Sequence, residues 1–189
     1  MPKSGSEGKS DSMNVSPVEE YGLRCAVQLA SLPEGQSLSA PEIADREGLS
    51  VEYVSKFMLL LRRGGLVRTI RGIKGGFMLA RSPEKISLKE VFDSLKQNKK
   101  SAESFCASFS GKSETCVRSK GCSIRPFWQI LSGYVEEFTT RLTLKDLLQG
   151  EAQTQLLART IAAENFEGLR NSLQKPHATQ EKNIEEVIL

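Results

Sequence analysis

Histidine is almost absent from this 189-residue chain, whose single histidine, His177, lies beside Pro176 near the C-terminus. The chain also lacks a glycine-rich loop placed between a strand and a helix, the arrangement that binds nucleotides. Without these groups no set of residues resembles a catalytic centre. We therefore predict that the protein is not an enzyme.

Long hydrophobic runs are missing too. No apolar segment approaches the length that crosses a bilayer, and the first fifteen residues are small, polar and charged, without the apolar core of a signal peptide. We expect residues 1–15 to form a disordered leader and the protein to be cytoplasmic, with no membrane partner. Structural disulfides are uncommon there, so the four cysteines are expected to be core residues, reactive thiols or metal ligands.

Acidic residues are absent from residues 53–83, which contain seven Lys or Arg although the whole chain has a formal net charge of only +3. Residues 50–79 read as an amphipathic helix, a Gly-Gly stop and two short strands, 66–70 and 77–80, around a glycine-rich turn. This order is typical of a winged helix-turn-helix that binds DNA. A winged helix that binds proteins is disfavoured, because the acid-free stretch coincides with both elements that would contact DNA.

Three capping boxes mark the starts of other helices. They begin at Ser16, Ser39 and Ser87, each with a glutamate three residues later. The first helix should extend to about Leu32, and the second should end at Gly48. The fold class is thus mainly α, with residues 16–83 as a winged helix-turn-helix domain that carries a small two-stranded wing.

Contacts with double-stranded DNA are expected from the recognition helix that follows Ser50 and from the wing. Ser55 and Lys56 should read base edges, while Arg71 and Lys74 should contact phosphates or the minor groove. The full set of expected DNA-binding residues is Ser50, Glu52, Ser55, Lys56, Arg62, Arg71, Lys74 and Gly75.

Three cysteines lie between residues 101 and 124, a stretch without helical or strand pattern. Cys106, Cys116 and Cys122 form a C-x9-C-x5-C array, and thiolates on such a loop suit a soft metal centre. The spacing is wider than in a zinc ribbon, which disfavours structural zinc. Three free thiols, or a thiol redox switch, are the alternatives. Cys25, within an apolar helix, is expected to be buried.

Three cysteines leave one position open on a tetrahedral iron. His177 lies in the tail and is a poor candidate, and Glu19 is the third residue of a capping box. Glu20 is the better candidate for the metal, although a carboxylate at a helix N-terminus is also favoured by the helix dipole alone.

Residues 125–142 predict a long helix with a broad apolar stripe, which would cover the protein's own core, form a dimer interface, or both. With the helix that starts at Ser87 and the cysteine loop, it makes a second unit, residues 84–150. Residues 151–189 form a C-terminal extension with some helical spacing, to which we assign no role and in which we expect partial disorder.

Several phrases of the sequence resemble a known family. They are EYGLRCAVQLA, SAPEIADREGLSVEYVSKFMLLLRRGGLVRTIRG, GIKGGFMLAR, ISLKEVFDSL and TLKDLL, together with the three loop cysteines. From about Val18 to Leu148 the chain resembles the Rrf2 family of winged-helix regulators, which includes IscR, NsrR and CymR. The resemblance implies a homodimeric transcription factor, usually a repressor, that binds a pseudo-palindromic site and dimerises through the long helix.

The resemblance also implies a cofactor. Many members hold an iron–sulfur cluster, 2Fe-2S or 4Fe-4S, through three cysteines that match Cys106, Cys116 and Cys122. In the nitric-oxide-sensing branch an acidic residue of the partner subunit is the fourth ligand, and Glu20 matches its position. The first cysteine interval is longer here than in the IscR branch, and Arg125 stands where that branch has a histidine. A regulator of the same fold that senses redox state through thiols alone is the alternative, and a cluster-carrying electron-transfer protein is a third reading.

Overall fold

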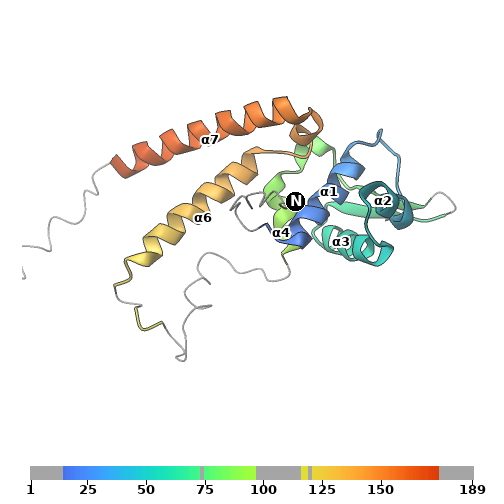
Figure 1. Ribbon diagram of the computed structural model, residues 1–189, viewed down its shortest axis with the longest axis horizontal. Coiled ribbons are helices and arrows are strands. Elements are labelled where there is room, and N and C mark those ends of the chain that lie inside the picture. Colours follow the sequence, from blue (N-terminus) through green and yellow to red (C-terminus); the bar gives the residue numbers. More distant parts are fainter. Residues whose placement is uncertain (1–14, 73–74, 97–115, 119–120, 175–189) are drawn as a thin grey trace, which may run out of the picture.

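The computed structural model describes residues 15–72, 75–96, 116–118 and 121–174. Its elements are α1 (Pro17–Ala30), α2 (Ala40–Glu47), α3 (Val51–Arg63), β1 (Val67–Ile70), β2 (Gly76–Leu79), α4 (Leu88–Leu95), α6 (Ile124–Arg141) and α7 (Glu151–Gln174), with 3-10 turns at Pro83–Lys85 and Asp146–Leu148. Figure 1 shows α1 to α4 and the sheet gathered at one end of the molecule, with α6 and α7 projecting side by side from it. The predicted fold, mainly helical with a two-stranded wing, is confirmed.

The three predicted capping boxes are all present. At the start of α1 the Ser16 hydroxyl accepts a hydrogen bond from the Glu19 backbone N–H at 3.2 Å, and the Glu19 carboxylate accepts one from the Ser16 N–H at 3.1 Å. Ser39 with Glu42, and Ser87 with Glu90, form the same reciprocal pair at α2 and α4. These local bonds satisfy backbone donors that a helix start leaves free, which is why the sequence alone located them.

The two strands pair antiparallel, with Val67 opposite Leu79 and Ile70 opposite Gly76. On its other side β2 pairs with Leu38, which exchanges two backbone hydrogen bonds with Phe77, at 3.0 and 2.7 Å. A Cβ on Gly76 would lie 2.4 Å from the Leu38 carbonyl oxygen, so only glycine fits between these backbones. The segment before α2 therefore anchors the base of the wing.

One apolar core joins the helices. The apolar stripe of α3 (Val54, Phe57, Met58 and Leu61) is fully buried against α1, α2 and α4. Leu142 and Leu144, just after α6, lie in the same core, as does Ile161 of α7. The helix-turn-helix and the C-terminal helices are therefore packed as one unit.

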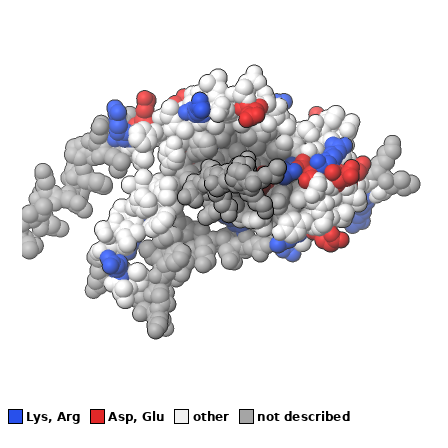
Figure 2. Space-filling view, viewed as in Figure 1, with Lys and Arg blue, Asp and Glu red and all other residues white. Residues whose placement is uncertain are grey.

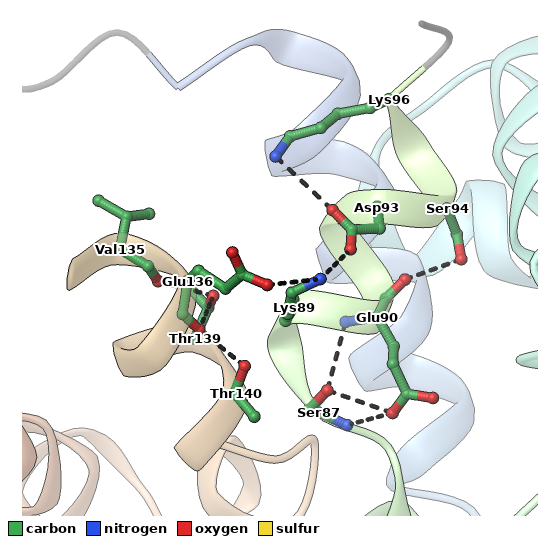
Figure 3. A network of polar contacts seen from close by, with 10 residues as sticks. All are labelled: Ser87, Lys89, Glu90, Asp93, Ser94, Lys96, Val135, Glu136, Thr139 and Thr140. Carbon is green, nitrogen blue, oxygen red and sulfur yellow. Dashed lines mark hydrogen bonds and ion pairs between the residues drawn. The ribbon is translucent and has the colours of Figure 1, made fainter. Parts of the chain in front are cut away.

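Helix α4 connects the DNA-binding part to α6 (Figure 3). The Lys89 ammonium lies 2.6 Å from Asp93 on its own helix and 3.4 Å from Glu136 on α6. Its pKa is raised, first by the hydrogen bond to Asp93 and further by Glu136. Backbone bonds add to this link, since the Leu88 N–H donates to the Leu142 carbonyl at 2.8 Å and the Leu144 N–H to the Ile86 carbonyl at 3.0 Å.

The first part of the C-terminal extension is a helix. Residues 151–174 form the helix α7, which packs along α6, while residues 175–189 lie outside the described part of the chain. Among the helices that the structure describes, none is both long enough and apolar enough to cross a membrane.

Candidate functional site

The recognition helix α3 exposes a polar surface along its length. Ser50 caps it, accepting a hydrogen bond from the Tyr53 N–H at 3.3 Å. Ser55, Lys56 and Arg62 are exposed. The buried stripe of α3 lies on a different face of the helix, so the side chains of these three residues are available to a ligand.

Glu52 lies in the first turn of α3 and is exposed. Its pKa is lowered, first by a hydrogen bond from its own backbone N–H and then by one from the Ser50 hydroxyl. The group is therefore a carboxylate at neutral pH, and a carboxylate can accept a hydrogen bond from cytosine N4 in the major groove.

In the wing, Arg71 is exposed, and Lys74 lies outside the described residues. The Gly75 N–H already donates to the Gly72 carbonyl at 2.8 Å, which closes the turn. A Cβ on Gly75 would lie 2.5 Å from the Ile70 carbonyl oxygen. Gly75 thus shapes the wing, and Gly72, at φ 112°, supplies the left-handed residue that this turn needs.

Two exposed cations were not among the residues expected to bind DNA: Arg63 at the end of α3 and Arg68 on β1. Both lie in the acid-free stretch, and this was the sequence signal that could have found them. The basic surface therefore includes more of the helix end and the wing than the motif alone indicated.

The first helix is clamped to the helix-turn-helix. The Arg24 Nε lies 2.7 Å from the Glu47 carboxylate at the end of α2, and the Arg24 Nη2 donates to the Glu47 backbone carbonyl at 3.1 Å. The Gln28 amide donates to the other carboxylate oxygen at 2.5 Å. The Glu47 side chain is only 7% exposed, so this carboxylate depends on α1 for its partners.

Two of the loop cysteines, Cys116 and Cys122, are in the described part of the chain, and Cys106 is outside it. Both are half-buried and neither forms a disulfide. Between them the Gly121 N–H donates to the Arg118 carbonyl at 3.3 Å, forming a turn that leads into α6. Cys122 directly precedes Ser123 at the start of α6, and the Ser123 side chain makes no capping bond to the first backbone donors of that helix. A helix start favours negative charge, which suits thiolate ligands there.

The two glutamates at the start of α1 differ as the sequence analysis expected. Glu19 is engaged in its capping box, whereas the Glu20 side chain is exposed and makes no hydrogen bond or ion pair within the described residues. No group of three potential metal ligands is assembled among the described residues. Cys25 is fully buried, and burial raises the pKa of its thiol to about 12, which fits the predicted role as a core residue.

The geometry defines a winged helix-turn-helix protein of the DNA-binding type, with a basic recognition helix and wing. The family model that matches residues 16–150 is Rrf2, described as an iron-dependent transcriptional regulator, and the chain belongs to that family. The predicted resemblance is thereby confirmed. The protein is a DNA-binding transcriptional regulator and, as its relatives are regulators, not an enzyme.

Relatives agree with this assignment. The chain is 28% identical over 148 residues to the HTH-type transcriptional regulator NsrR of Halalkalibacterium halodurans, covering 78% of this chain and 98% of that protein. Among solved structures, IscR of T. potens matches with 27% identity and a TM-score of 0.57 over 72% of this chain and 87% of that one. CymR of B. subtilis, named as the global cysteine regulator, matches with 26% identity and a TM-score of 0.57 over 72% and 96%.

Proposed function

We propose that this protein is a homodimeric repressor whose binding to a pseudo-palindromic DNA site is controlled by an iron–sulfur cluster. The observation that carries the proposal is the presence, in one Rrf2 chain, of a basic winged-helix reader and three cysteines just before α6. The description of the family as iron-dependent and the similarity to NsrR along nearly its whole length support it.

The proposed ligands are Cys106, Cys116, Cys122 and Glu20. Soft thiolates are the donors that iron–sulfur clusters take, and the two described cysteines fit, being half-buried, unpaired and close to a helix N-terminus. Glu20, whose exposed side chain makes no hydrogen bond or ion pair within the described residues, would complete the set from the partner subunit. When bound, a 2Fe-2S or 4Fe-4S cluster supplies a centre sensitive to redox state, iron supply or nitric oxide.

The path to DNA starts at α1. Glu20 lies one helical turn before Arg24, and Arg24 clamps Glu47 at the end of α2. Gly48 at φ 64° then makes the tight turn into α3. A ligand that binds Glu20 and displaces α1 would therefore also displace the recognition helix, through the contact between Arg24 and Glu47. Such a ligand changes the DNA-binding equilibrium only as far as it binds the two arrangements differently.

At the DNA we propose that Ser55, Lys56 and Glu52 read base edges, and that Arg62, Arg71 and Lys74 contact phosphates or the minor groove. The N-terminus of α3, capped by Ser50, would meet the backbone, and Gly75 would hold the wing in shape. Lys74→Ala should weaken binding to every sequence and lower the salt slope by roughly one unit. Lys56→Ala should instead change sequence preference, and equal losses on specific and random DNA would contradict its role.

The first experiment is the visible spectrum of anaerobically purified protein with an iron and sulfide count per chain, followed by DNA binding of the cluster-bound and cluster-free forms. Cys106→Ala, Cys116→Ala and Cys122→Ala should each abolish the colour. Cys25→Ala is the matched control and should keep it, because that thiol is buried in the core. Glu20→Ala tests the fourth ligand. Equal promoter binding by both forms would refute control by the cluster.

A thiol-based redox regulator of the same fold is the second candidate, favoured by the structural similarity to CymR, the global cysteine regulator. It would be colourless and iron-free even after cluster reconstitution, and its DNA binding would follow oxidant and reductant. Loss of that response in Cys116→Ala or Cys122→Ala, with none in Cys25→Ala, would establish it over the cluster.

A further inference from the structure

The apolar stripe of α6 is buried at one end of the helix and exposed at the other. At the C-terminal end of the helix, Phe138 packs against the core and Leu142, just beyond the helix, is buried in it. Toward the N-terminus the stripe is open to solvent, and no described residue of α6 is fully buried. The exposed large hydrophobics of this part are Ile124, Phe127, Trp128, Ile130, Leu131 and Val135. Within the described residues, one chain thus covers only one end of the apolar stripe of α6.

Helix α7 covers one flank of α6 and is fastened there by polar contacts. The Tyr134 hydroxyl donates to the Ala162 carbonyl at 3.1 Å, and the Arg141 guanidinium donates to the Asn165 side chain at 2.9 Å and pairs with Glu164. Asn165 is 3% exposed. These contacts fix the register of the two helices, so the position of α7 on α6 is specific.

A groove runs between the two helices. It is lined by Phe127, Ile130, Leu131 and Tyr134 from α6 and by Phe166 and Leu169 from α7. Phe166 is 62% exposed and Phe127 58% exposed, although both are large and apolar. In Figure 2 charged side chains lie along the outer edge of α7, and the part of α6 that is not covered in this view is mostly uncharged. The open face is therefore shared by both helices.

The size of this face can be compared with that of a protein interface. If the whole surface of one such side chain is roughly 200 Å², the seven exposed residues (the six on α6 and Phe166) leave on the order of 650 Å² uncovered. A stable interface buries about 800 Å² on each partner. Without Phe166 the same estimate falls to about 500 Å², so α6 alone offers distinctly less than a stable dimer buries.

We propose that α7 is part of the dimer interface: Phe166 joins Phe127 and Leu131 in one apolar surface that a second copy of this chain covers. The inference rests on the proposed homodimer and adds the C-terminal helix to it. A second copy is the fitting occupant because the surface continues the α6 stripe. A two-fold interface must be self-complementary, and this surface offers both a groove and exposed aromatic side chains.

The test is the dimer dissociation constant of the full chain, measured by sedimentation equilibrium at several protein concentrations. Phe166→Glu should raise it at least tenfold, because two-fold symmetry places the charge in the interface twice. Leu156→Glu is the matched control, since Leu156 lies on the same helix, is 68% exposed and does not line the groove. It should leave the constant within twofold of wild type. Phe166→Ala, which adds no charge, should raise the constant in the same direction, and far-ultraviolet circular dichroism should show unchanged helix content.

The outcomes separate this inference from the proposed function. If Phe127→Glu dissociates the dimer and Phe166→Glu does not, α7 is outside the interface and the inference is overturned, while a dimer through α6 stands. If Leu156→Glu is as disruptive as Phe166→Glu, the effect is not specific to the groove and the inference fails too. A wild-type chain that is monomeric at all concentrations would overturn both.

Discussion

A glycine lies where the C-terminal end of the recognition helix meets α4. A Cβ placed on Gly64, at the C-terminal end of α3, would lie 1.9 Å from the Ser94 Oγ and 2.6 Å from the Ser94 Cβ. The hydroxyl could rotate away from its bond to the Glu90 carbonyl, but the Cβ is fixed to the backbone of α4. Gly64→Ala must therefore push the two helices apart.

The magnitude follows from two opposing effects. Overpacking of this kind typically costs about 1–3 kcal/mol. Replacing glycine by alanine at φ −75°, an ordinary right-handed conformation, returns up to about 1 kcal/mol of helix propensity. We expect Gly64→Ala to lower the free energy of unfolding by about 1–2 kcal/mol. Urea denaturation should show a lower midpoint with an unchanged slope.

A double-mutant cycle with Ser94→Gly isolates the contact. Once the Ser94 Cβ is removed, Gly64→Ala should become neutral or slightly stabilising, giving a coupling energy of at least about 1 kcal/mol. Gly168→Ala is the control: it lies in α7 with no atom within 4 Å of the added Cβ, and it should raise stability. An unchanged or higher stability of Gly64→Ala, or an equal loss in the Ser94→Gly background, would refute the reasoning.

Three further predictions concern single contacts. Because burial raises the pKa of the Cys25 thiol to about 12, native protein at pH 8 should not be alkylated there by iodoacetamide until denaturant is added; rapid native labelling would contradict this. Arg24→Gln should lower the Tm and weaken specific DNA binding, because Glu47 loses its charged partner on α1 and keeps only the hydrogen bond from Gln28; unchanged DNA affinity would exclude the clamp from signalling. Arg141→Met leaves the buried Asn165 oxygen without its donor and should cost about 1–3 kcal/mol in urea denaturation, with Asn165→Leu restoring much of the loss if the unpaired amide is the cause.

Much of the winged helix could be predicted from the sequence because its signals are local. A capping box lies within four residues, and the buried stripe of α3 is a periodicity along one helix. The turn of the wing could also be predicted from its glycines, because a left-handed residue such as Gly72 favours the absence of a Cβ. The two strands on either side of it were predicted as well. The acid-free stretch indicated the DNA-binding helix and wing, although it did not single out Arg63 and Arg68.

The contacts that join distant segments could not be predicted from the sequence. Nothing in the chain indicates that Arg24 faces Glu47, that Gly64 touches Ser94, or that Leu38 pairs with Phe77, because such pairs depend on how helices cross. Glu19 and Glu20 form an intermediate case: the capping box assigned Glu19 by itself, and the fold left Glu20 exposed.

The C-terminal half shows the division most clearly. The sequence by itself determined that residues 125–142 form a helix with an apolar stripe, because the spacing of three and four residues is written into that segment. Only the tertiary structure decided that Phe138 turns into the core, that α7 covers one flank through Tyr134 and Arg141, and that Phe127 stays open beside Phe166. A periodic pattern shows that a face will be buried, but the partner that buries it is chosen by long-range packing of the whole chain.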